Sequence, residues 1–153
     1  MLKRAWLALA LSLTVLALAC SSGGAAKPNS TGDLSRTGEA GGVTVEATWL
    51  TEDGLGAVDA DLAQYPLNEF VLFKVGLDTH SGDLGKLDLK STASLKQSGA
   101  DVQAEAWVDL SNDSHHRSGV LVFRRTQTEG PVELTVNLGD DEVTLRWETP
   151  PEA

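Results

Sequence analysis

The fold is constrained most strongly by an alternation of apolar and polar residues that recurs from Val43 to Trp147. Successive residues of a strand point to opposite faces of a sheet, so this period of two predicts half-buried β-strands. No comparable helical spacing follows residue 20. We expect about seven strands, over residues 43–49, 70–75, 87–89, 102–108, 119–123, 132–136 and 143–147.

Short strands joined by polar, glycine-containing turns within about 105 residues are typical of one all-β domain. The last two predicted strands are joined by 139–142, which suits a hairpin connection. We therefore predict an antiparallel β-sandwich of about seven strands, immunoglobulin-like or cupredoxin-like, over residues 43–148, with a tail at 149–153. Three tryptophans lie in predicted strands and are expected in the core: Trp49, Trp107 and Trp147.

The N-terminal residues follow a different pattern. Lys3 and Arg4 precede an apolar or weakly polar run over residues 5–19, which ends directly at Cys20. Basic residues followed by a short apolar run are typical of an export signal. A run of about 15 residues is shorter than the roughly 20 that a membrane-spanning helix needs. We therefore predict a cleaved signal peptide over residues 1–19.

The residues around the predicted cleavage site, Leu16-Ala17-Leu18-Ala19-Cys20, resemble the lipobox of bacterial lipoproteins. The resemblance implies that Cys20 becomes the first residue of the mature protein and carries acyl chains on its thiol and usually on its amino group. Two or more chains hold a protein stably on a membrane. We therefore expect an exported protein, anchored to the cell membrane or outer membrane by its N-terminal lipid. The alternative is an ordinary signal peptide, which would leave the single cysteine as a free thiol.

Residues 20–42 are rich in small and polar side chains, and Leu34 is the one large apolar residue among them. This composition is typical of a flexible linker between the lipid anchor and the domain. Because no second cysteine exists, a disulfide cannot stabilise the domain, and its core must do so.

The chain has a formal net charge of −10 at pH 7. Such a surface repels phosphate groups, so we expect no nucleic acid partner and no direct contact with anionic lipid heads beyond the anchor at Cys20. Cationic ligands and metal ions are attracted to it. Solubility is the alternative reason for the charge.

The three histidines, His80, His115 and His116, all lie in predicted loops. Antiparallel strands alternate in direction, and following them along the chain places both histidine loops at one end of the domain. Neutral imidazole is a common ligand of zinc and copper, and carboxylates complete such sites. We therefore predict a copper or zinc site formed by these histidines with Asp78.

A structural role is the alternative for these loops. In that interpretation residues 78–81 form a hydrogen-bonded turn, and His115 and His116 are polar loop residues that buttress it. The segments 77–84 and 115–123 also resemble motifs of uncharacterised exported bacterial β-sandwich domains. That resemblance implies no activity.

No catalytic motif is found: the sequence lacks a Gly-x-Ser-x-Gly elbow, a glycine-rich phosphate loop and an available cysteine nucleophile. We therefore predict a non-enzymatic binding domain and keep two hypotheses. The first is copper or zinc binding by the loop histidines. The second is contact with an envelope protein through a sandwich face, an end loop or the irregular segment 50–67, with structural histidines.

Overall fold

The computed structural model describes residues 34–126 and 129–149, so the predicted signal peptide and Cys20 lie outside the described residues. Within these ranges no helix has the length and apolar character needed to cross a bilayer. The strands are β1 (Ser35–Ala40), β2 (Val43–Trp49), β3 (Phe70–Thr79), β4 (Ala93–Gln97), β5 (Ala100–Asn112), β6 (His116–Arg124), β7 (Val132–Asn137) and β8 (Glu142–Trp147). The helical segments are α1 (Glu52–Leu55), the 3-10 helix η1 (Leu84–Lys86) and α2 (Leu89–Thr92).

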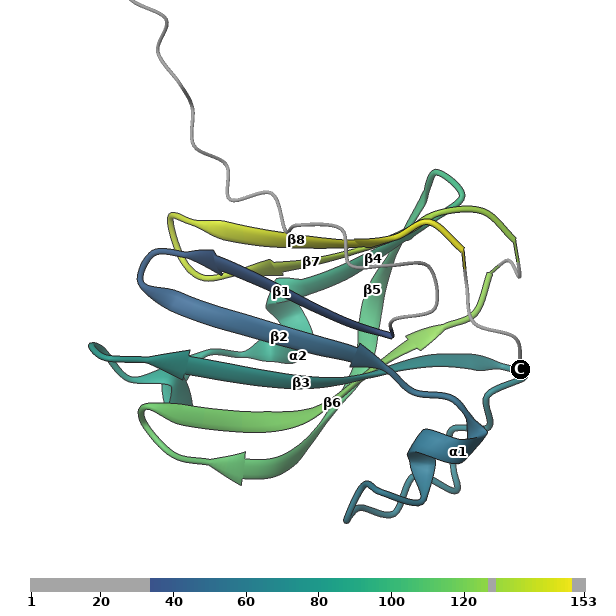
Figure 1. Ribbon diagram of the computed structural model, residues 1–153, viewed down its shortest axis with the longest axis horizontal. Coiled ribbons are helices and arrows are strands. Elements are labelled where there is room, and N and C mark those ends of the chain that lie inside the picture. Colours follow the sequence, from purple (N-terminus) through teal and green to yellow (C-terminus); the bar gives the residue numbers. More distant parts are fainter. Residues whose placement is uncertain (1–33, 127–128, 150–153) are drawn as a thin grey trace, which may run out of the picture.

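The strands form one nearly closed antiparallel sheet in the order β1-β2-β3-β6-β5-β4-β7-β8 (Figure 1). Strand β5 joins the two halves, because its first residues pair with β4 and its later residues pair with β6. The pairing shifts between Ala104 and Ala106. Such a bulge bends a strand, and the bend lets β5 pass from one half of the sheet to the other.

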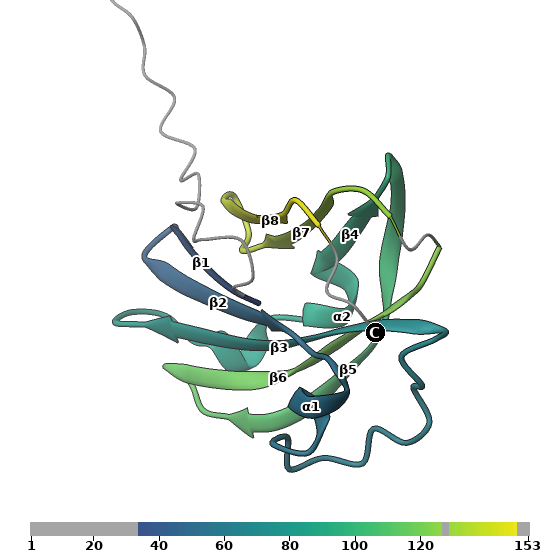
Figure 2. The ribbon, with the colours of Figure 1, turned by 45° about the vertical axis from the view of Figure 1, so that its right-hand side comes forward.

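The two edge strands, β1 and β8, lie side by side in both views of the ribbon (Figures 1 and 2). Side chains hold this seam: Arg36 Nε donates a hydrogen bond to the carbonyl of Arg146 at 3.0 Å. Gly38 permits the close approach, because a Cβ at this position would lie 2.7 Å from Cγ1 of Val143. The sheet is therefore closed by side-chain contacts at the seam.

The main core lies inside the nearly closed sheet and draws residues from β2 to β8. Its centre is a group of aromatic rings, in which Phe73 lies 5.1 Å from Trp49 and 4.8 Å from Trp147 between ring centroids. Large rings packed at these distances contribute both buried area and favourable ring contacts. The predicted core positions of Trp49 and Trp147 are confirmed, whereas Trp107 is partly buried and packs at the margin of the core.

The segment between β2 and β3 packs on the outer face of the sheet, where α1 lies (Figure 2). Leu50, Val58 and Leu62 of this segment are buried with Leu72 of β3 and Val122 of β6 in a second apolar cluster. The irregular segment expected from the sequence therefore has a packing role.

The prediction of an antiparallel all-β domain is confirmed, and the finer expectations differ from the structure. The eight strands make one continuous sheet, so a two-sheet immunoglobulin-like or cupredoxin-like sandwich of about seven strands is not the observed arrangement. Strand β1 lies within residues 20–42, where composition indicated a linker, because pairing with β2 overrides its weak apolar pattern. Residues 87–89 are not a strand, since the Asp88 side chain accepts a hydrogen bond from the Ser91 amide and caps α2.

Candidate functional site

The end of the domain shown at the left of Figure 1 brings the histidine loops together. Strand β3 ends at Thr79, immediately before His80, and β6 begins at His116. These strands are neighbours, and Asp78 lies opposite His116 in their register. The prediction that the histidine loops share one end of the domain is confirmed. We call this region the histidine end.

Asp78 and His116 are in direct contact, through Oδ1 of the aspartate and Nδ1 of the histidine. Both side chains are exposed, at 59% for Asp78 and 74% for His116. A polar contact this exposed contributes little to stability. The contact does, however, engage Nδ1 and leave Nε2 as the available ring nitrogen, which is how carboxylates orient metal-binding histidines.

His80 and His115 do not join this contact. Among the described residues, no group of three or more histidine, cysteine, aspartate or glutamate side chains is close enough to hold a metal ion. His115 lies in the bend at the tip of the β5–β6 hairpin, whereas His116 is the first residue of β6. The structure thus unites two of the four predicted ligands, Asp78 and His116.

Hydrogen bonds lock the two histidine loops into one unit. The amide of Thr79 donates to the carbonyl of His115 at 3.0 Å, and the amide of Leu84 donates to the carbonyl of Ser114 at 2.8 Å. The hydroxyl of Thr79 accepts a hydrogen bond from the Ser81 amide at 3.2 Å. These contacts support the structural interpretation of the turn that contains His80.

Asp113 fixes the tip of the β5–β6 hairpin. Its Oδ1 accepts a hydrogen bond from the His115 amide at 2.9 Å. Hydrogen bonds from the amides of His115 and, to a smaller extent, His116 lower the pKa of Asp113 below its ordinary value. The ionised carboxylate is therefore the form that holds the hairpin.

Arg117, next to the histidine pair, is the residue at this end that sequence reasoning missed. Its side chain is only 7% exposed. Nη1 donates to the carbonyls of Leu84 at 3.0 Å and Leu87 at 2.6 Å, while Nη2 donates to Asp109 at 3.2 Å. The guanidinium also lies 5.4 Å from the centroid of the Trp107 ring. Arg117 therefore fastens the η1–α2 segment to the sheet.

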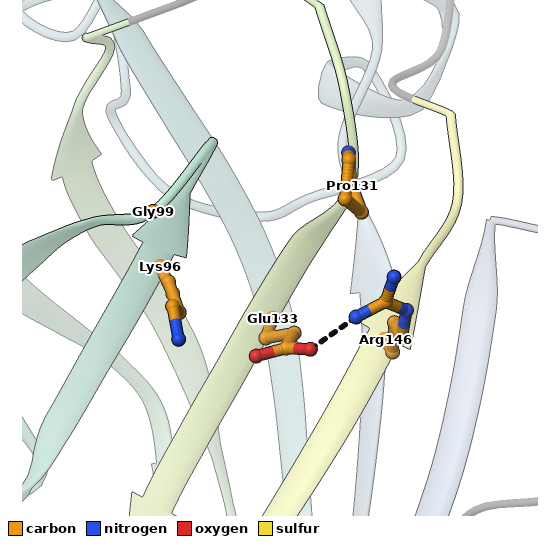
Figure 3. Close-up of a pocket in the computed structure, with 5 residues that line it drawn as sticks. All are labelled: Lys96, Gly99, Pro131, Glu133 and Arg146. Carbon is orange, nitrogen blue, oxygen red and sulfur yellow. Dashed lines mark hydrogen bonds and ion pairs between the residues drawn. The ribbon is translucent and has the colours of Figure 1, made fainter.

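A second candidate is a shallow recess on the outer side of β4, β7 and β8 (Figure 3). Its volume is about 130 Å³, which limits it to a small ligand. Arg146 is paired with Glu133 inside the recess and with Glu148 beside it, so its charge is already compensated. The recess is lined by Lys96, Gly99, Pro131, Glu133 and Arg146.

Comparison with known proteins finds no matching family model, no similar curated protein and no similar solved structure.

Proposed function

We propose that this protein is a bacterial lipoprotein, anchored to a membrane through Cys20, whose β domain binds a protein of the cell envelope. The anchor is supported by one sequence feature, the apolar run over residues 5–19 that follows Lys3 and Arg4 and ends at a cysteine after a small residue. Cys20 is the only cysteine, so it is the only thiol that can carry the lipid.

Fatty-acid labelling tests the anchor. In bacteria grown with labelled palmitic acid, the wild-type protein should carry the label and sediment with membranes, because an acylated cysteine partitions into the bilayer. Cys20→Ser should lose the label completely. Ser22→Ala, which keeps the cysteine, serves as the matched control and should behave as wild type. Unlabelled wild-type protein in the soluble fraction would rule the anchor out.

The outer face of β5 is the observation that supports a binding role for the domain. The segment between β2 and β3 covers the neighbouring strands, whereas Ala106, Val108 and Leu110 of β5 stay partly exposed on the same face. Apolar side chains grouped on a rigid sheet are a common basis for contact with another protein. We name these three residues the β5 face.

Copper or zinc binding at the histidine end is a second candidate, favoured by the contact between Asp78 and His116. Asp78 would orient the ring, and Nε2 of His116 would be the metal ligand. His80 and His115 lie in the adjoining loops and would have to approach to complete the coordination.

Metal titration tests this second candidate on the lipid-free Cys20→Ser protein without a histidine tag. If the site exists, one equivalent of zinc or copper(II) should bind, and His116→Ala should weaken binding about tenfold or more because its nitrogen is lost. Asp78→Asn should have a smaller effect in the same direction. Gln64→Ala, in the segment between β2 and β3, is the control. Binding that is unchanged by His116→Ala would exclude the site.

A further inference from the structure

The segment that joins β2 to β3, residues 50–69, carries an uncompensated negative charge, and we call it the acidic strap. It contains no lysine, arginine or histidine. Within the described chain, only Glu69 of the strap forms an ion pair, with Arg124 at 3.1 Å. Unpaired like charges produce a negative potential that attracts cationic groups. The exposed carboxylates without an ion pair in the described chain are Glu52, Asp53, Asp59 and Asp61.

The strap leaves an apolar strip beside it. The strap covers Leu72 of β3 and Val120 and Val122 of β6. These three side chains are fully buried although they point to the outer face. The β5 face packs against the same apolar cluster but stays partly exposed. Apolar side chains of the strap that are also partly exposed extend the strip: Leu55, Ala60, Tyr65 and Leu67.

Strand β5 carries three carboxylates of its own. It contains Asp101, Glu105 and Asp109 and no basic residue. Glu105 is paired with Arg124 and Asp109 with Arg117, while Asp101 forms no ion pair within the described chain. Glu105 and Asp109 are thus already compensated, so the uncompensated charge beside the apolar strip belongs to the strap.

We propose that the β5 face and the acidic strap form a docking surface for a basic amphipathic segment of a partner protein. Its apolar residues would contact Val108 and Leu110, and its lysines or arginines would meet the strap carboxylates. An acidic segment would be repelled, and a neutral one would remove water from carboxylates without supplying a counter-charge. Anionic lipid is disfavoured by the same repulsion. The inference rests on the proposed binding role and specifies the chemistry of the partner.

A defined peptide tests the charge requirement. The probe is a fluorescent helix of about 16 residues, with leucines on one face and lysines on the other, titrated against the lipid-free Cys20→Ser protein at near-physiological salt. Replacing Asp59→Asn and Asp61→Asn together should weaken binding about fivefold or more. The matched control, Asp140→Asn with Asp141→Asn at the histidine end, removes the same charge and should change binding less than twofold. If both double variants weakened peptide binding equally, the interaction would depend only on the net charge of the protein, and the proposal would be overturned.

The apolar requirement is tested on the same protein. Leu110→Ser should weaken binding of the leucine–lysine peptide about tenfold, because an apolar contact is lost. Circular dichroism reports whether Leu110→Ser is folded. If it is unfolded, Val108→Thr tests the same apolar contact, because threonine keeps the shape of the valine side chain. A lysine-only peptide that binds as tightly as the amphipathic one would overturn the proposal, as would no binding of either.

The failure of this inference is distinguishable from failure of the proposed function. Cross-linking in the envelope that captures a partner at another face would overturn the docking surface and leave the binding role intact. Fatty-acid labelling of Cys20 reports on the anchor independently of either result.

Discussion

Gly119→Ala is expected to destabilise the protein by about 3 kcal/mol, although it adds a single methyl group. A Cβ on Gly119 would lie 2.6 Å from the carbonyl oxygen of Val108 and 2.7 Å from Cε2 of Trp107. The carbonyl belongs to the backbone of the paired strand and cannot rotate away. The added methyl group must therefore push β5 away from β6 and displace the indole ring that packs against the core.

The matched control is Gly76→Ala on β3, the strand that pairs with β6 on its other side. Apart from Gly76 and its two chain neighbours, no atom of the described chain lies within 4 Å of a Cβ built on Gly76, so this substitution should change stability by less than about 1 kcal/mol. Urea unfolding of both variants measures the difference. Similar small losses in the two would contradict the close packing of Trp107 on Gly119.

Arg117→Met is expected to cost a similar amount, about 3 kcal/mol, because it removes a buried donor group with several partners. The methionine can fill the space but cannot donate to the carbonyls of Leu84 and Leu87, which lose a hydrogen-bond partner beside the core. Asp109 loses its ion pair, and the Trp107 ring loses the guanidinium stacked near it. The η1–α2 segment should loosen from the sheet.

His116→Ala, at the neighbouring residue, provides the contrast. Its pair with Asp78 is exposed, so its loss should change the free energy of unfolding by less than about 0.5 kcal/mol. Arg117→Lys should rescue Arg117→Met only in part, because one ammonium group cannot reproduce the planar guanidinium fork. Chemical denaturation, with hydrogen exchange of the Leu84 amide, follows both effects. A larger loss for His116→Ala than for Arg117→Met would mean that the histidine pair holds this end together.

The all-β character was predictable because burial of one face of a sheet produces an alternation of apolar and polar residues in each strand. Strand β1 was missed because few of its side chains reach the core, so its structure depends on pairing with β2, and composition does not reveal that pairing. The short helices η1 and α2 were not predicted for another reason. The Asp88 cap of α2 is a local contact with Ser91, whereas the hydrogen bonds from Arg117 to the carbonyls of Leu84 and Leu87 join residues far apart in the sequence, which local patterns do not reveal.

The position of the histidine end was predictable, but which of its side chains are in contact was less so. Strand direction alone places His80, His115 and His116 at the same end, but side-chain distances depend on loop geometry, which brings only Asp78 to His116. Arg117 had a usable signal. Arg117 lies an even number of residues before the buried Leu121 and Phe123 in the same strand. The alternation therefore places its charged side chain on the inner face.

The seam between β1 and β8 bears on how this domain behaves among many copies of itself. An open sheet ends in rows of backbone donors and acceptors that recruit strands from neighbouring molecules, which is a common route to aggregation. Here the two terminal strands shield each other, and the side chain of Arg36 occupies a backbone acceptor of β8. The fold thereby protects itself against strand-to-strand association at high local concentration without needing a complete barrel.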